Sequence, residues 1–219
     1  MSDNIRDEVI IALVDLSGSM IGRASSAIGY QLFELLSALR DKQEDANNSI
    51  RLGILAFHET AYWIIKPTQV NQIQNLPELN PVPGNDGLGR KSNYAEMLKE
   101  LNNCMTERFL CETRALHDLH LLLFTDGCPT DKSTDFIKAM ELIRKNPIFS
   151  NTHTKRYIVK ENKKEIHFSG MENHVDMTDY LKIFASNEQN IVSADDFSTL
   201  QGDIINELVG KEKLESVFD

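Results

Sequence analysis

The sequence lacks the features of a basic protein and of a disordered one. Its 219 residues include 23 Lys and Arg against 33 Asp and Glu, which gives a formal net charge of −10. Such an acidic chain is not a general binder of nucleic acids or anionic membranes, because phosphate groups attract clustered Lys and Arg. The hydrophobic content of 41% is typical of a globular domain and argues against intrinsic disorder.

Cysteine is also scarce. The three cysteines, Cys104, Cys111 and Cys128, are odd in number and show no C-x-x-C spacing. This set fits neither a disulfide framework nor a zinc knuckle. We therefore expect reduced thiols in a cytoplasmic protein.

Long hydrophobic runs are missing as well. The longest early apolar run covers only Val9 to Val14, between Glu8 and Asp15. It is too short to span a membrane and does not resemble a signal peptide. Its β-branched residues instead predict a strand that is buried on both faces.

Strands and helices are expected to alternate along the rest of the chain. Apolar runs predict strands at 9–14, 50–57, 61–65, 119–124 and 190–193, and periodic apolar positions predict helices at 28–39, 94–105, 135–145, 179–185 and 197–208. Only His58–Thr60 separates the second run from the third, which predicts an antiparallel hairpin. Residues 77–91 are rich in Pro and Gly and are expected to form a surface loop, and residues 154–170 two extended pieces.

This alternation predicts one α/β domain over residues 1–219. We expect a doubly wound, Rossmann-like, mostly parallel sheet with one antiparallel edge strand and helices on both faces. In such sheets ligands bind beyond the carboxyl ends of the strands, where the strand order reverses. Side chains that follow the strands are therefore the first candidates for a functional site.

Oxygen-bearing side chains stand at three such places. Asp15, Ser17 and Ser19 form a D-x-S-x-S motif after the first strand, Ser92 precedes a predicted helix, and Asp126 follows the strand at 119–124. Helix capping by Ser17 or Ser19 would explain a serine here but not the whole set. The five side chains are expected to meet at one edge of the sheet.

Two carboxylates and three hydroxyls are hard ligands that suit Mg²⁺ and are poor for zinc. Mn²⁺ and Ca²⁺ are alternatives, although Ca²⁺ usually binds more carboxylates. The two Asp side chains balance the charge of a divalent ion, and the serines add none. An octahedral ion would therefore keep a position open for an oxygen ligand from elsewhere.

With these residues the chain resembles a von Willebrand factor A (VWA) domain. The metal-ion-dependent adhesion site (MIDAS) of that family combines D-x-S-x-S with a Thr or Ser from a second loop and an Asp from a third. Asp15, Ser17 and Ser19 match the first element, Ser92 the second and Asp126 the third. The resemblance implies a noncatalytic protein-interaction module whose Mg²⁺ binds an Asp or Glu of a protein partner.

Residues 124–131 (FTDGCPTD) and 181–185 (LKIFA) resemble the compact bacterial tellurium-resistance-associated VWA proteins. That likeness implies a stress-response or signalling assembly with a protein kinase or a PP2C-type phosphatase. The basic residues of segment 154–170 depart from the pattern. They are expected to form either a solvated edge hairpin or a docking surface.

An enzyme is the alternative interpretation. Asp15, Thr125 and the Asp195–Asp196 pair imitate the Mg²⁺ site of haloacid-dehalogenase-type phosphohydrolases, with Asp15 as the nucleophile. The pattern fails at Ser17, because that position normally holds a second Asp that acts as general acid, and Ser cannot supply a proton near neutral pH. The Asp195–Asp196 pair more simply begins a helix, where negative charge is favourable.

The six histidines are expected to be structural or solvated. His117 and His120 are three residues apart in a predicted strand, so regular alternation would point their side chains to opposite faces. The sequence therefore predicts no histidine metal site.

Overall fold

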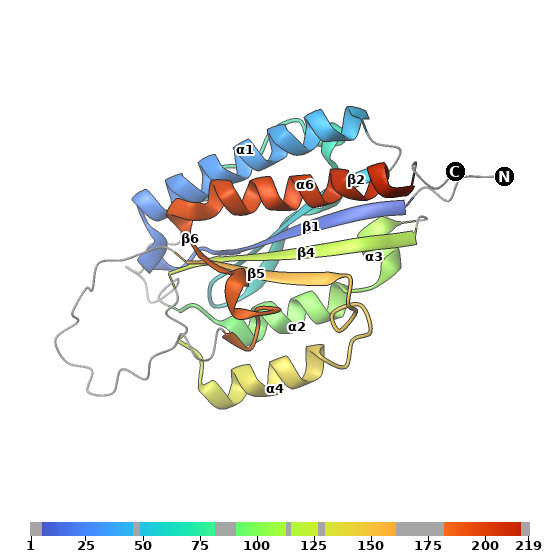
Figure 1. Ribbon diagram of the computed structural model, residues 1–219. Helices are drawn as coiled ribbons and strands as arrows, with labels where there is room; N and C mark the ends of the chain where they lie inside the picture. Colours follow the sequence, from blue (N-terminus) through green and yellow to red (C-terminus); the bar gives the residue numbers. More distant parts are fainter. Residues whose placement is uncertain are drawn as a thin grey trace.

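A six-stranded sheet runs through the centre of the molecule (Figure 1). The computed structural model describes residues 6–45, 49–81, 91–112, 115–126, 130–160 and 182–215. The strands are β1 (Arg6–Asp15), β2 (Ser49–Phe57), β3 (Ala61–Gln69), β4 (Ala115–Thr125), β5 (Thr154–Lys160) and β6 (Ile191–Ser193). The α-helices are α1 (Arg23–Asp45), α2 (Tyr94–Cys104), α3 (Glu107–Cys111), α4 (Ser133–Ile143) and α6 (Phe197–Glu215), with 3-10 turns η1 (Gly18–Met20), η2 (Val70–Gln72), η4 (Glu188–Asn190) and η5 (Ala194–Asp196).

The strand order is β3-β2-β1-β4-β5-β6. β1 pairs in parallel with both β2 and β4, and β4-β5 and β5-β6 are parallel too, whereas β3 is antiparallel to β2. The chain adds β2 and β3 on one side of β1 and then returns to add the other strands on the opposite side. The predicted fold class, a doubly wound α/β sheet with one antiparallel edge strand, is confirmed.

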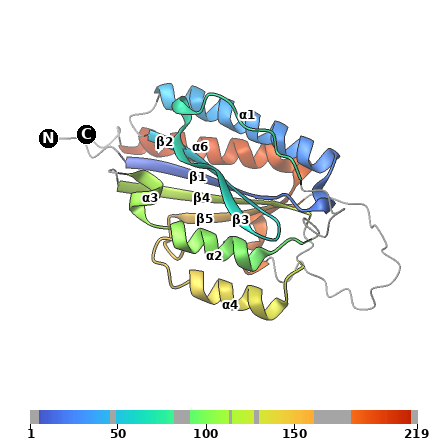
Figure 2. The same cartoon turned by 180° about the vertical axis from the view of Figure 1, so that it is seen from behind.

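Successive side chains of β1 point alternately into two hydrophobic cores, one on each face of the sheet. Ile10, Ala12 and Val14 pack in the layer of α1 and α6, and the odd-numbered residues from Val9 to Leu13 pack in the layer of α2 and α4. Figures 1 and 2 show these helix pairs on opposite faces of the sheet. Because both faces of β1 are covered, its run from 9 to 14 needs an apolar side chain at every position. Among the described residues, no helix is long and apolar enough to cross a membrane.

Some elements differ from the expected ones. β3 continues beyond residue 65 through Pro67, which an edge strand tolerates because its outer N–H groups need no partner strand. The short helix α3 was not expected, and the Thr106 side chain caps it by accepting from the Phe109 N–H at 3.2 Å. Residues 82–90, the second extended piece beyond residue 160 and the start of the helix expected at 179–185 lie outside the described residues.

The structure corrects one expectation for the basic residues of segment 154–170. β5 lies between β4 and β6, so its residues do not form an edge hairpin. The Arg156 guanidinium donates to the carbonyl oxygens of Phe184 at 2.9 Å and Phe149 at 2.8 Å, and its carbon lies 4.7 Å from the centroid of the Phe149 ring. Arg156 thus fastens the neighbouring segments to the sheet. Lys163 and Lys164 lie outside the described residues.

A buried ion pair joins β1 to β2 near the amino edge of the sheet. The Nε of Arg51 donates to Oδ2 of Asp7 at 2.6 Å, and the two side chains are 4% and 0% exposed. Arg51 also donates to the carbonyl oxygen of Pro67 and to Glu112, whose side chain is 70% exposed. Removing one member of a buried pair leaves the other charge without compensation in a medium of low polarity.

We expect Asp7→Asn to lower the free energy of unfolding by about 3 kcal/mol, because Arg51 would lose its buried carboxylate partner. The matched variant Glu112→Gln, which removes that exposed carboxylate, should cost less than about 1 kcal/mol. Urea denaturation of both variants measures the difference. Equal losses would show that burial does not set the strength of this network.

Candidate functional site

The parallel pairing of β1 and β4 brings two predicted acids to one edge of the sheet. Asp15 is the last residue of β1, and Asp126 directly follows β4. The partners Val14 and Phe124 face each other in the register, so Asp15 lies next to Thr125. The Thr125 hydroxyl donates to Oδ2 of Asp15 at 3.2 Å, and both acids are buried, with 0% and 5% exposure for Asp15 and Asp126.

The D-x-S-x-S segment turns back over Asp15. The Ser17 N–H donates to Oδ1 of Asp15 at 2.9 Å, and the hydroxyl oxygens of Ser17 and Ser19 are 3.0 Å apart. The Leu16 N–H donates to the Phe57 carbonyl at 2.8 Å, which anchors the turn to the end of β2. Ser17 is buried and Ser19 is exposed, so the motif extends from the core to the surface.

Ser92 reaches the same carboxylate from a second loop. It is buried immediately before α2, and its hydroxyl is near enough to Asp15 to lower the pKa of that carboxyl. Asn93 fixes this loop, because its side chain accepts from the Glu96 N–H at 3.1 Å and its N–H donates to the His58 carbonyl at 2.8 Å. All five predicted residues therefore lie at the edge of the sheet formed by the carboxyl ends of the parallel strands, here called the carboxyl edge. Ser17, Ser92 and Asp126 each shift the pKa of Asp15.

Asp131 was not among the predicted ligands, and it connects the loop before α2 with the loop that follows β4. Its carboxylate accepts from the N–H groups of Tyr94 at 3.3 Å and Ala95 at 2.8 Å, at the first turn of α2. The Thr130 N–H donates to the Ser92 carbonyl at 3.0 Å. A carboxylate at a helix N-terminus satisfies free N–H groups and interacts favourably with the helix dipole. Burial raises the pKa of Asp131.

A buried tyrosine orients the Asp15 carboxylate indirectly. The Tyr94 hydroxyl and the Thr125 hydroxyl share a hydrogen bond, and Thr125 in turn donates to Asp15. Tyr94 also packs edge-on against Phe57, with ring centroids 5.2 Å apart. The sequence pattern identified Tyr94 as part of an apolar helix face but not its polar contact.

The electrostatics of the edge favour a cation. Burial, together with the nearby charge of Asp126, raises the pKa of Asp15 to about 6. Hydrogen bonds from Ser17 and Ser92 lower the pKa but only partly offset burial. The Asp15 carboxylate, whose charged form is disfavoured by burial and by the charge of Asp126, would gain from a positive ion placed beside it. The oxygen-only donor set fits a hard divalent cation.

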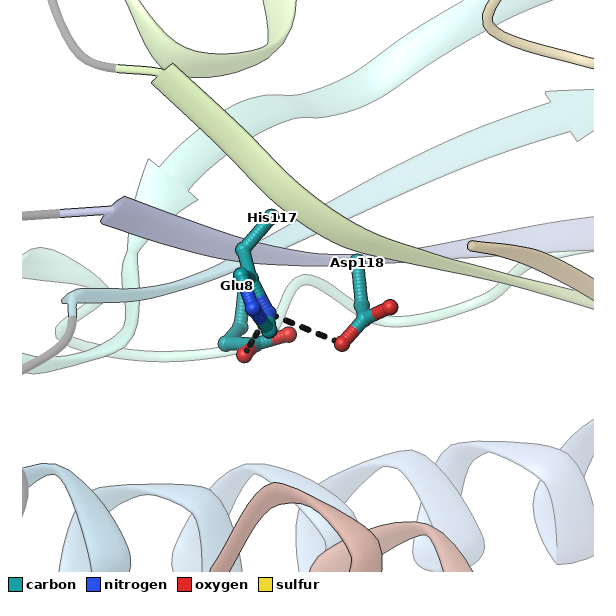
Figure 3. Close-up of side chains that lie close together, drawn as sticks. All are labelled: Glu8, His117 and Asp118. Atoms are coloured by element: carbon teal, nitrogen blue, oxygen red, sulfur yellow. Dashed lines mark hydrogen bonds and ion pairs between the residues drawn. The ribbon is translucent and has the colours of Figure 1, made fainter. Parts of the chain in front are cut away.

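A different group of ligand side chains lies at the opposite edge of the sheet. Glu8, His117 and Asp118 place their carboxylate oxygens and ring nitrogen within 4.8 Å of one another (Figure 3). The prediction of no histidine metal site overlooked this group. A β-bulge in the β1-β4 pairing interrupts the strand alternation on which that prediction depended.

Comparison with known sequences identifies no family: no protein-family model and no curated protein matches the chain. Solved structures do match. The pilus adhesin SpaC from Lactobacillus rhamnosus GG, in its open conformation, aligns with a TM-score of 0.67 at 9% identity. That match covers 94% of this chain and 30% of SpaC, so the chain spans less than a third of the adhesin.

Two smaller proteins match over nearly their full length. The vWF domain of the type V pili tip protein Mfa5 from Porphyromonas gingivalis has a TM-score of 0.60 at 10% identity, over 94% of this chain and 96% of that one. The conserved hypothetical protein BatB from Bacteroides thetaiotaomicron has a TM-score of 0.58 at 15% identity, over 94% and 98%. These likenesses show that the chain has the fold of a vWF domain.

We expect the metal-free protein to lose stability as pH rises from about 4 to 6. The folded-state pKa of Asp15, about 6, exceeds the ordinary value of 3.8 for this side chain, so the folded state binds more protons in this window. Asp15→Asn should remove the part of that dependence due to Asp15, leaving the part due to Asp131, whose pKa is also raised, and should stabilise the protein at pH 7 by on the order of 3 kcal/mol. Urea denaturation in EDTA at several pH values measures this. A variant less stable than the wild type at pH 7 would contradict it.

Proposed function

We propose that residues 1–219 form one VWA domain that binds Mg²⁺ through Asp15, Ser17, Ser19, Ser92 and Asp126 and recognises a carboxylate of a protein partner. The observation that carries the proposal is the meeting of two buried acids with three hydroxyl-bearing residues at the carboxyl edge. The vWF-type fold supports it, because the strand ends that carry these residues meet where doubly wound sheets bind ligands.

The donor set supports Mg²⁺ more than other ions. Asp15 and Asp126 balance the two positive charges, and the serine hydroxyls are small, neutral oxygens. Mn²⁺ shares this preference for oxygen ligands, whereas zinc favours thiolate and imidazole. A bound Mg²⁺ would supply a Lewis-acidic position that still accepts an anionic oxygen. The exposed Ser19 places the open side of the site toward solvent, where an Asp or Glu of a partner would replace a water.

A groove beside the site would offer further contact to a partner. It lies between α2 and α4, has a volume of about 450 Å³ and begins at Lys91 and Asn93, next to Ser92. Its lining also includes the lysines Lys99, Lys132 and Lys138 and the acids Glu96, Asp131 and Asp135, and Lys99 forms an ion pair with Glu96 at 2.5 Å. With Lys91 the lysines outnumber these acids by four to three, so the groove would oppose an acidic partner segment less than expected from a chain with a net charge of −10.

The cellular setting is part of the same proposal. We assign the domain to a cytoplasmic stress-response or signalling assembly, in which a protein kinase or a PP2C-type phosphatase is the candidate partner. The tellurium-resistance-type motifs support this assignment. Cys104 and Cys111 are free, and burial raises the pKa of the Cys111 thiol to about 12, which is compatible with a reducing compartment. The structural neighbours SpaC and Mfa5 are described as pilus proteins, so the proposed cytoplasmic location is supported by the sequence motifs and not by these neighbours.

The dehalogenase-type alternative has less support from the geometry. Asp195 and Asp196 follow β6, which is separated from β1 by β4 and β5. Three strand spacings correspond to about 14 Å, too far for a shared ion with Asp15. Ser17 occupies the position where that chemistry needs a general acid. We therefore propose a noncatalytic role.

Calorimetric titration with Mg²⁺ tests the metal site. We expect Asp15→Asn to weaken Mg²⁺ binding by more than about 100-fold, since even residues that only support ligands contribute about 10- to 100-fold. Asp195→Asn is the matched control, because it removes an exposed acid from the same edge of the sheet and should leave binding unchanged. Equal binding by wild type and Asp15→Asn would contradict the assignment.

Capture of proteins from the native cell tests the interaction. With the immobilised domain, we expect specific partners in Mg²⁺, their loss in EDTA, and their return when excess Mg²⁺ is added back, because the cation is needed to bind the partner carboxylate. Asp15→Asn should capture none of them, and its folding can be verified from its urea denaturation curve. If the partners are still captured in EDTA, they do not bind through a carboxylate on the Mg²⁺ ion, even if the domain binds Mg²⁺.

A further inference from the structure

The amino edge of the sheet carries a second group of potential ligands, far from Asp15 along the same two strands. Glu8 lies near the start of β1, and His117 and Asp118 lie near the start of β4. In Figure 3 the three side chains point to the same side of the sheet, toward the layer of α1 and α6. Glu8 and Asp118 are each 3% exposed, and the His117 side chain is 20% exposed.

A β-bulge creates this arrangement. In the pairing of β1 with β4, Asp7 faces Leu116 and Val9 faces Leu119, so two residues of β4 stand opposite Glu8 alone. Regular alternation would send His117 and Asp118 to opposite faces. The bulge turns both toward Glu8, and bulges of this kind are rare between parallel strands and frequent beside functional sites.

The distances suit a small metal ion. His117 Nδ1 lies 2.9 Å from Oε1 of Glu8 and 2.9 Å from Oδ2 of Asp118. Ligands bound tetrahedrally at 2.0–2.1 Å are about 3.3 Å apart, so an ion could enter after shifts of a few tenths of an ångström. A neutral imidazole with a divalent ion balances the charges of the two carboxylates, whereas a proton on His117 balances only one of them.

His153 supports the group from outside. Its Nδ1 lies 3.0 Å from Oδ1 of Asp118, the oxygen that does not face His117, and its side chain is 60% exposed. Carboxylates that bind metals are commonly held by such an outer hydrogen bond, which fixes their orientation. The exposed ring also marks the side from which an ion would enter.

We propose that Glu8, His117 and Asp118 bind a divalent transition-metal ion of the Zn²⁺ type, with His153 as a positioning residue and water as the fourth ligand. An imidazole ligand favours Zn²⁺ and similar transition-metal ions, whereas Mg²⁺, Ca²⁺ and Mn²⁺ prefer sites made of oxygen ligands. This site is independent of the Mg²⁺ site proposed at the carboxyl edge. Its ligands lie on the strands themselves, so it would fasten β1 to β4.

Titration with Zn²⁺ alone, under reducing conditions and in a background of Asp15→Asn, tests the proposal without using the other site. We expect one Zn²⁺ per chain and an increase in the melting temperature. His117→Gln and Asp118→Asn should weaken binding by more than about 100-fold, and His153→Gln by about 10- to 100-fold. His58→Gln is the control for an imidazole elsewhere and should bind as tightly as the parent.

Co²⁺ used in place of Zn²⁺ gives a direct view of the ligands. We expect the visible absorption of four-coordinate Co²⁺ without thiolate charge-transfer bands, and its loss in His117→Gln. Circular dichroism verifies that each variant folds, and Glu8→Gln replaces any variant that does not. Absence of Zn²⁺ binding by the parent, or equal binding by His117→Gln, would overturn the proposal and leave the group as an ion-pair cluster only.

Discussion

The parallel pairing of β1 with β4 is the contact on which both ends of the molecule depend. At the carboxyl edge it places Asp15 beside Thr125 and within electrostatic reach of Asp126. At the amino edge the same pairing places Glu8 against His117 and Asp118. A slip of one residue would turn the apolar side chains of β1 from one core into the other and separate both groups. The two-sided burial of the run from 9 to 14 therefore fixes the register and, with it, the chemistry at the two edges.

Burial of apolar side chains in the centre of the sheet stabilises the fold, whereas the buried Asp15 carboxylate at its carboxyl edge destabilises it. Full burial of one Val, Leu or Ile side chain contributes about 1.5–3 kcal/mol. The cost of keeping Asp15 ionised at neutral pH is similar, on the order of 3 kcal/mol. This cost is therefore about as large as the contribution from burying one or two apolar side chains of β1. Hydrogen bonds from Thr125 and the Ser17 N–H fix the carboxylate in one orientation, so a cation would meet a preformed ligand.

The sequence was sufficient for features that depend on local pattern. The apolar run at 9–14 and the short link at His58–Thr60 identified a buried strand and a hairpin, and strand ends located Asp15 and Asp126. Features set by contacts between distant segments could not be predicted. No spacing rule joins Asp131 to the first turn of α2, and none indicates that Arg156 turns inward to Phe184. The bulge opposite Glu8 could not be predicted either, because nothing in the sequence distinguishes His117 and Asp118 from residues of a regular strand.

The two edges differ in how their ligands are held, which bears on what each ion would do. At the carboxyl edge Asp15 ends a strand, but Ser17, Ser19 and Ser92 lie on turns and a loop. Asp131 and Asn93 hold the Ser92 loop at the start of α2, and the Leu16 N–H anchors the turn of Ser17 and Ser19 to the end of β2. Small changes in these loops could alter the ion's coordination, and a partner carboxylate that favours one arrangement would shift the population toward it. At the amino edge all three ligands lie on β1 and β4, and the residues on both sides of the bulge are paired, which limits their movement. An ion there would stabilise the fold, whereas an ion at the carboxyl edge would be placed where a partner could bind to it.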